Sequence, residues 1–286
     1  MQKPKVLAML NIVLLEAHKI FTKWRTYIGF LTIGIIVPLI VVGLKLSGIN
    51  PTQNAMFNFQ EEFITTGNLF NGWFISHLIM HSLFVHIPFL ITLVAGDSLA
   101  GEATSGTYRI LLTRPVSRIK VLTIKYITTI FYTSTLVVFL AALSIGLGHL
   151  FFGDGDLIIF RGEILLLPVD EVWWRFLLAY LGALVAMWTV ASLAFFFSSF
   201  VENAIGPIIG TMAVLIIFLI IGELPIEFFK TIKPYLFTTY SSVWTKAFEE
   251  PVNFNEIFKS ISYLCIYCGG FFLVTLYLFR RKDILS

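Results

Sequence analysis

Six long runs of apolar residues constrain the fold of this chain more than any other feature. A helix needs about 20 mostly apolar residues to cross the hydrocarbon core of a bilayer. Lipid offers the backbone no hydrogen-bond partner, so runs of this length must form helices. The runs contain no Asp, Glu, Lys or Arg, and they cover residues 27–44, 73–95, 126–150, 176–200, 204–221 and 261–279. The sequence therefore predicts an all-α integral membrane protein, a six-transmembrane-helix bundle forming a single domain over residues 1–286.

The composition excludes a water-soluble domain. Only 13% of the residues are charged and 57% are hydrophobic, whereas soluble domains carry about 25% charged residues. The net charge of +3 is also too small to indicate a nucleic-acid partner. The apolar surface must therefore face a lipid bilayer.

The segment before the first run is amphipathic. Residues 6–26 place Val13, Ala17 and Phe21 on one helical face, and Lys19 and Lys23 on the other. A helix with such faces lies in the membrane surface rather than across it. We therefore expect an interfacial helix here.

Charges in the loops predict the orientation. With the N-terminus inside, the cytoplasmic segments hold 13 of the 20 Lys and Arg residues and 5 of the 17 acids. Basic residues collect on the cytoplasmic side of membrane proteins. We predict a multi-pass protein of the plasma (inner) membrane with both termini in the cytoplasm. Residues 222–256 then form a large outer loop.

One cytoplasmic loop, residues 96–118, is unlike a plain linker. Apolar residues that include Leu111 and Leu112 stand between charges such as Arg109 and Arg114. Local signals predict a break after Gly96, a short helix over 98–104, a turn at 105–106 and a stop at Pro115. The apolar residues cover either lipid or another protein, and the pattern alone leaves both open.

This loop reads G-E-x-x-x-G-T-x-R-x-L-L-x-x-P-V-S-R from Gly101 to Arg118. The run resembles the cytoplasmic loop between the second and third spans of ABC transporter permeases of the type-2 exporter class. The layout is similar as well, with an N-terminal elbow helix, six spans, a short turn at 201–203 and an enlarged outer loop before the last span. The likeness covers about 25 residues in motif and the whole chain in layout.

The resemblance implies that loop 96–118 forms a coupling helix seated in a groove of a separate ATPase subunit. Glu102 matches the family's acidic position, Gly106 and Thr107 the turn, and Leu111, Leu112 and Pro115 the docking segment. Arg109 and Arg114 would pair with acids of the ATPase or with anionic lipid. The implied partners are two ATPase subunits, a second permease copy or a homologous permease, and the bilayer.

The chain has no sequence of the form G-x-x-x-x-G-K-[ST], so it cannot bind ATP through a P-loop. ATP and Mg²⁺ are expected on the partner subunit. We expect no catalytic residue, cofactor or metal in this chain, and therefore no enzyme activity of its own.

Histidines mark the second run, where polar side chains are costly. His77 and His81 lie four residues apart and share a helical face, whereas His86 lies about 140° further round. The pair predicts a polar cleft or part of a translocation path, and hydrogen bonding to neighbouring helices is the simpler alternative. At the outer start of the fourth run, Arg175 is expected to snorkel to the headgroups.

These features predict the permease subunit of an ATP-driven exporter. Two other functions remain open, an ion-driven secondary transporter and a non-transporting regulatory membrane subunit. The runs carry almost no ionisable pairs, which counts against the ion-driven transporter.

Overall fold

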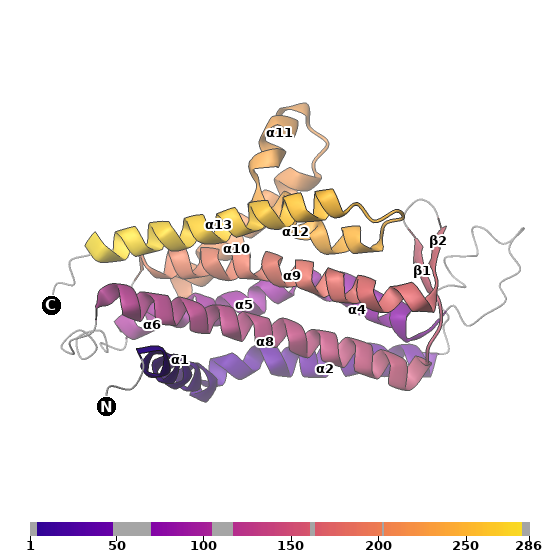
Figure 1. Ribbon diagram of the computed structural model, residues 1–286, viewed down its shortest axis with the longest axis horizontal. Coiled ribbons are helices and arrows are strands. Elements are labelled where there is room, and N and C mark those ends of the chain that lie inside the picture. Colours follow the sequence, from indigo (N-terminus) through magenta and orange to yellow (C-terminus); the bar gives the residue numbers. More distant parts are fainter. Residues whose placement is uncertain (1–4, 48–69, 105–116, 161–163, 202, 282–286) are drawn as a thin grey trace, which may run out of the picture.

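The computed structural model describes residues 5–47, 70–104, 117–160, 164–201 and 203–281, with side chains described from residue 12 onward. Long helices run side by side along one axis (Figure 1). They are α2 (Trp24–Ser47), α4 (Gly72–Phe84), α5 (Ile87–Ala95), α8 (Arg118–Phe152), α9 (Val169–Ser198), α10 (Ile205–Glu223) and α13 (Phe254–Arg281).

The predicted all-α membrane fold is confirmed. Five helices, α2, α8, α9, α10 and α13, are long and apolar enough to cross a membrane. Helix α4 and the helical stretch 87–104, which meet at 52°, make a sixth crossing when the bent pair is counted as one broken span. The chain is therefore a multi-pass membrane protein.

The second span is broken, where the sequence predicted one run over 73–95. Helix α4 ends at Phe84, and α5 begins after a turn at Val85 and His86. Pro88 lies in the first turn of α5 and cannot donate a backbone N–H to Phe84. The missing hydrogen bond explains why the helix breaks here.

Other helices extend past the apolar runs. Helix α8 begins at Arg118, eight residues before the predicted third span, because helical backbone continues through charged residues outside the apolar region. The amphipathic helix α1 (Lys5–Thr22) ends earlier than residue 26, and α2 starts at Trp24 after a bend at Lys23.

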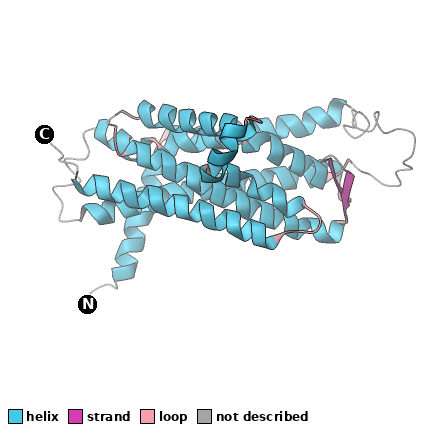
Figure 2. Ribbon diagram, turned by 90° about the horizontal axis from the view of Figure 1, so that it is seen from above, coloured by secondary structure: helices cyan, strands magenta, loops and turns pink. Residues whose placement is uncertain are grey.

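The two ends of the bundle differ. Helix α1, the short helix α6 (Asp97–Thr104) and the start of α8 lie at one end, called the α6 end below (Figure 1). Helix α1 leaves the bundle at a steep angle (Figure 2). This is the arrangement expected of a helix that lies in the membrane surface while the spans cross it.

A β-hairpin forms the opposite end of the bundle, called the hairpin end below. Strands β1 (Leu157–Phe160) and β2 (Ile164–Leu167) pair antiparallel, with Leu157 opposite Leu167. Both leucines are buried. Asn71 fixes the hairpin to the start of α4, because its side chain donates to the Asp156 carbonyl at 2.7 Å and accepts from Phe74 N at 3.1 Å.

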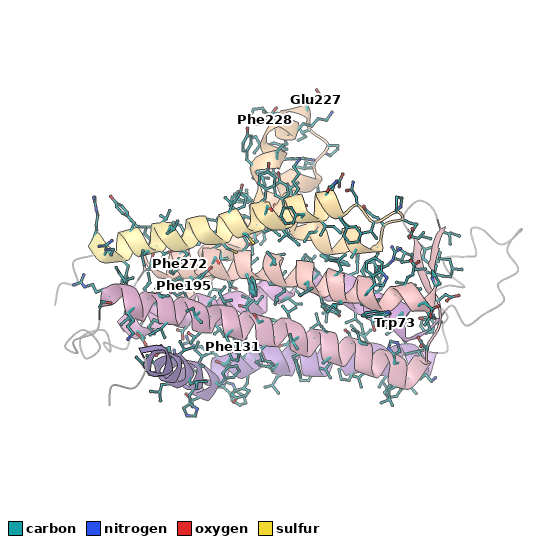
Figure 3. All side chains as sticks on the ribbon, in the orientation of Figure 1. Trp73, Phe131, Phe195, Glu227, Phe228 and Phe272 are labelled. Carbon is teal, nitrogen blue, oxygen red and sulfur yellow. The ribbon has the colours of Figure 1, made fainter. Side chains whose placement is uncertain are left out.

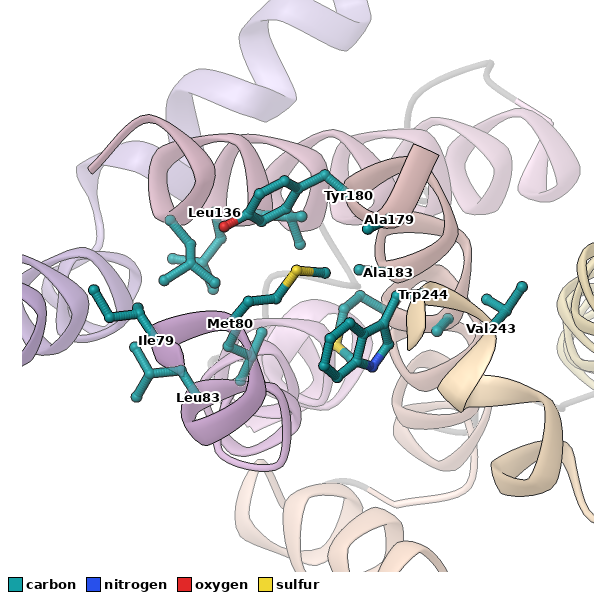
Figure 4. Packing of buried hydrophobic residues seen from close by; sticks show 14 of the residues in the cluster. Ile79, Met80, Leu83, Leu136, Ala179, Tyr180, Ala183, Val243 and Trp244 are labelled. Atoms are coloured by element: carbon teal, nitrogen blue, oxygen red, sulfur yellow. The ribbon is translucent and has the colours of Figure 1, made fainter. Parts of the chain in front are cut away.

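The predicted large loop, residues 222–256, forms short helices in two distinct parts. Helix α11 (Glu227–Ile232) and the 3₁₀ turn η1 (Lys233–Tyr235) project sideways from the bundle, with Glu227 and Phe228 near the tip (Figure 3). Helix α12 (Phe237–Ser241) and the 3₁₀ helix η2 (Ser242–Phe248) instead pack against α9. Figure 4 shows Val243 and Trp244 of η2 beside Ala179 and Ala183.

Arg175 holds this loop in place, and the expectation that it snorkels to the headgroups is wrong. Its side chain is only 2% exposed. The guanidinium donates to Glu171 Oε2 at 2.8 Å and to the Glu249 carbonyl at 2.8 Å, and it also pairs with the Glu250 carboxylate. A buried guanidinium needs such partners, because an unpaired charge away from water is costly.

Small residues let the start of α4 and the end of α8 approach closely at the hairpin end of the bundle. Ser76 Oγ donates to the Gly72 carbonyl at 2.7 Å and lies 3.0 Å from the Ser144 carbonyl of α8. A Cβ atom on Gly148 would lie 2.7 Å from the Gly72 oxygen. Close packing of small residues is a main source of helix association in lipid, where hydrophobic burial gives no drive.

We predict that Gly148→Leu destabilises the protein by about 1–3 kcal/mol, because the added side chain forces α4 and α8 apart. The measurement is the melting temperature of the purified protein in detergent. Gly146→Leu is the matched control, since a Cβ there meets no described atom within 4 Å. Equal melting temperatures for the two variants would contradict the proposed packing.

Candidate functional site

The α6 end carries the part of the loop that the sequence singled out. Helix α6 follows α5 after a single turn residue, Gly96, as the sequence predicted. Gly96 packs against the start of α10, where an added Cβ would lie 3.1 Å from Ile208 Cγ1 and 2.8 Å from the Thr92 carbonyl. A side chain at Gly96 would therefore push α6 away from α10.

Ser198, the last residue of α9, fixes the start of α6. Its Oγ accepts hydrogen bonds from Leu99 N at 3.1 Å and Ala100 N at 2.9 Å, and donates to the Gly96 carbonyl at 2.6 Å. The first N–H groups of a helix have no partner within the helix. Ser198 satisfies two of them from another span, so α6 is tied to the end of α9.

Lys125 of α8 makes the strongest charged contacts at this end. Its Nζ lies 2.6 Å from Glu16 Oε1 of α1 and 2.6 Å from Glu102 Oε1 of α6, and its side chain is only 4% exposed. Glu16 Oε2 also meets Lys19 Nζ at 3.1 Å. One buried ammonium thus joins three segments that are far apart in the sequence.

Asp97 makes a second set of ion pairs beside the first. Its carboxylate oxygens lie 2.9 Å from Lys23 Nζ and 2.9 Å from Arg25 Nη1, at the junction between α1 and α2. Gly101, one helical turn further on, leaves room for this carboxylate, because a Cβ there would overlap Asp97 Oδ1. The first turn of α6 is therefore anchored to the α1–α2 junction.

Together these residues form the charged cluster, which lines a cleft of about 320 Å³ between α1, α2, α5, α6 and α8. The cluster consists of Glu16, Lys23, Arg25, Asp97, Glu102 and Lys125. Within the described ranges, no group of three or more His, Cys, Asp or Glu residues is arranged to hold a metal ion. The observed contacts connect helices, so the arrangement is suited to transmitting movement.

The charges perturb the pKa of Glu16. Burial by itself raises the pKa of this carboxyl, but the attraction and hydrogen bond of Lys125, with a smaller contribution from Lys19, lower it below its usual 4.5. The carboxylate is therefore ionised at neutral pH, as the ion pair requires.

Most of the residues predicted to contact an ATPase lie outside the described residues. These are Gly106, Thr107, Arg109, Leu111, Leu112, Arg114 and Pro115. Glu102 is described, and its carboxylate points into the bundle toward Lys125. The geometry thus gives Glu102 a part in holding α6 in place.

His77 and His81 face the segment η2. The His77 ring meets the Phe248 ring edge-on at 4.9 Å, and the His81 ring lies 5.9 Å from that of Trp244. These contacts account for both histidines as packing partners of the large loop. A role in a polar cleft stays a prediction.

Sequence reasoning missed Glu16, Asp97, Lys125 and Ser198 as parts of one site. Asp97 and Lys125 stand directly outside the second and third apolar runs, which was the available signal. A charge at that depth tends to be paired. The pairing itself depends on how α1 folds back on the bundle, which the sequence pattern does not specify.

We predict that Lys125→Met lowers the free energy of unfolding by about 3–5 kcal/mol, because it removes the buried cation that Glu16 and Glu102 share. The readout is thermal unfolding of the purified protein, with Lys120→Met on the same helix as control. Adding Glu16→Gln and Glu102→Gln to Lys125→Met should restore much of the loss. A triple variant as unstable as the single one would argue against a charge effect.

The lowered pKa of Glu16 also predicts a pH dependence. A carboxyl with a lower pKa in the folded state stabilises the protein above the unfolded pKa, and this stabilisation is lost as the pH falls through the folded-state value. Glu16→Gln should therefore melt below the wild type at neutral pH, and the gap should narrow at pH values below 4.5. Melting curves over this range test it; a constant gap would refute the assignment.

A family model described as "Protein of unknown function (DUF2705)" matches residues 32–285 of the chain. A search among curated proteins found no match. The matched region contains residues 32–47 of α2 and every later helix and strand described above. The chain therefore belongs to the DUF2705 family.

Proposed function

We propose that this chain is the membrane-spanning permease subunit of an ATP-driven exporter. It would form the substrate path and couple to a separate ATPase subunit that binds ATP and Mg²⁺. The loop motif from Gly101 to Arg118 and the layout of the spans support this proposal. In this assembly two ATPase subunits serve two permease copies, or one copy and a homologous permease.

The observation that carries the proposal is the connection of α6 to the rest of the α6 end. Salt bridges join α6 to the α1–α2 junction and to Lys125 of α8, which also pairs with Glu16 of α1, and Ser198 joins α6 to α9. Helix α6 also continues directly from the broken second span. A displacement of the neighbouring loop would therefore reach four spans at once.

The broken second span supplies a place for the bundle to bend. In the proposed mechanism, ATP binding closes the two ATPases and shifts α6, and the turn at Val85 and His86 absorbs the change in angle. Hinges are short segments that accept large backbone changes. The chain breaks no covalent bond, and its task is to stabilise one of two packings of the same bundle.

The proposal places the α6 end in the cytoplasm and the hairpin end outside, in the plasma (inner) membrane. The distribution of Lys and Arg supports this orientation, since 13 of 20 fall on the segments that the sequence predicts to be cytoplasmic. The steep angle between α1 and the spans also fits a helix in the cytoplasmic membrane surface.

We expect the tagged chain, purified from its own membranes, to bring down an ATPase with a P-loop. Replacing Leu111 and Leu112 together by Asp should abolish this association, because charges cannot enter an apolar groove. Immunoblotting and mass spectrometry measure the bound ATPase. Leu166→Asp, on the exposed side of β2 at the hairpin end, is the matched control.

Glu102→Arg is a poor probe of the docking surface, because it would disrupt the Lys125 ion pairs from within. Loss of ATPase binding in the Leu111 and Leu112 variant alone favours the exporter. Transport that persists without any bound ATPase would instead favour the ion-driven transporter. Bound ATPase without transport would favour the regulatory subunit.

A second prediction concerns coupling rather than binding. Ser198→Ala removes the cap from α6, at a cost of about 1–3 kcal/mol for the unpaired buried groups. The ATPase should still bind, but its stimulation by the permease should fall several-fold. The assay compares ATP hydrolysis by the complex with that of the free ATPase, with Ser82→Ala on α4 as control. Unchanged stimulation would disprove a role for the cap.

A further inference from the structure

The cleft beside the charged cluster has a basic rim that its surroundings can reach. Lys19, Lys23 and Arg25 line it, and their side chains are 55%, 48% and 58% exposed. The volume of about 320 Å³ lies at the lower end of the range for ligand sites in proteins, about 300–1,000 Å³. A small charged group can therefore enter the cleft and contact these side chains.

The cleft has one positive charge in excess. At neutral pH the four cations Lys19, Lys23, Arg25 and Lys125 line it together with the three carboxylates Glu16, Asp97 and Glu102, so its net charge is +1. An anion with a single negative charge would neutralise this excess, whereas a cation would add to it. The charge therefore favours a monoanion as the occupant.

Two of the rim side chains keep hydrogen-bond donors to spare. Asp97 accepts from Lys23 Nζ and from Arg25 Nη1, each at 2.9 Å, and so brings the two cationic groups together at one carboxylate. An ammonium has three N–H donors and a guanidinium has five. Among the described residues, Nη1 is the one nitrogen of Arg25 that makes a hydrogen bond. A second acceptor can therefore bind both side chains.

Neighbouring aromatic residues indicate that the rim lies at the depth of the lipid headgroups. Trp24 and Tyr27 adjoin Lys23 and Arg25 in the chain, and they are 73% and 43% exposed. Trp and Tyr are enriched where a membrane meets water. Helix α1, which forms one wall of the cleft, also leaves the spans at the steep angle expected of a surface helix (Figure 2). The anions present at this depth are lipid phosphates.

We infer that the cleft binds the phosphate of a phospholipid with one net negative charge, such as phosphatidylglycerol. Lys23 Nζ and the remaining N–H groups of Arg25 donate to the phosphate oxygens, and Lys19 adds its charge at the rim. A choline lipid offers the same phosphate without the net charge and should bind more weakly. The inference requires that α1 lies in the membrane surface, and it does not depend on a partner ATPase.

Native mass spectrometry of the full-length protein in a non-ionic detergent tests the inference. The protein is titrated with phosphatidylglycerol or with phosphatidylcholine that has the same acyl chains. The first phosphatidylglycerol should bind about tenfold more tightly than the first phosphatidylcholine, an effect the size of one charge-assisted hydrogen bond. Equal affinities for the two lipids would overturn the inference.

A matched pair of variants assigns the binding to the cleft. Arg25→Gln should lower the affinity for phosphatidylglycerol about tenfold, because it removes a charged donor to the phosphate. Arg280→Gln removes the same charge from an exposed position near the end of α13, also at the α6 end, and should leave the affinity unchanged. An equal loss in both variants would mean that the lipid binds to dispersed surface charge, and the cleft would be wrong as the site.

Asp97→Asn separates a contact with the lipid from an effect on the fold. It removes the carboxylate that competes for Lys23 and Arg25 and raises the net charge of the cleft to +2, so the affinity for phosphatidylglycerol should rise. A loss like that of Arg25→Gln would show that only an intact cluster matters and would contradict the proposed contacts. Gel filtration and melting temperature confirm that each variant is folded, and Arg25→Lys replaces Asp97→Asn if the latter is not. It keeps the charge and should keep most of the affinity, whereas a loss equal to that of Arg25→Gln would contradict the role of charge.

Competition distinguishes a lipid from a soluble phosphate ester. Glycerophosphoglycerol has the headgroup and charge of phosphatidylglycerol but no acyl chains. At equal concentration it should not displace the lipid, because acyl chains hold a lipid at the apolar surface of the protein. Displacement at equal concentration would identify a soluble phosphodiester as the occupant and would overturn the assignment to a lipid.

Discussion

The ammonium group of Lys125 is the interaction on which the α6 end depends. It is nearly excluded from solvent and lies 2.6 Å from a carboxylate of α1 and 2.6 Å from a carboxylate of α6. A buried cation is tolerated only when it is paired, so moving α1 or α6 away would cost Lys125 one of its two carboxylate partners. The position of both helices therefore follows from where α8 places one lysine.

Ion pairs fix the positions of these helices because the hydrophobic effect does not select helix partners within lipid. Lipid tails are as apolar as leucine, so apolar side chains alone do not specify which helices pair. The bundle uses paired charges at its two ends, with Lys125 at one and Arg175 at the other. At the hairpin end it also relies on close contact of small residues such as Gly72 and Gly148.

The break in the second span lies between the two ends of the bundle that the ion pairs of Lys125 and Arg175 hold in place. Pro88 removes one backbone hydrogen bond, and α4 and the next helical stretch meet at 52°. On one side of the break, α6 connects the second span to the charged cluster. On the other side, η2 packs against α9. A bend between two well-anchored ends is suited to the switching that we propose for the exporter.

The sequence by itself determined the six apolar spans, the surface helix before them and the short helix after Gly96. It could do so because span length and amphipathic periodicity are local properties of the chain. Tertiary structure alone decided that Lys125 joins Glu16 and Glu102 and that Ser198 caps α6. It also made Arg175 a buried anchor rather than a snorkelling residue. Each of these contacts joins residues distant in sequence, and their meeting depends on how the helices pack, which no local pattern encodes.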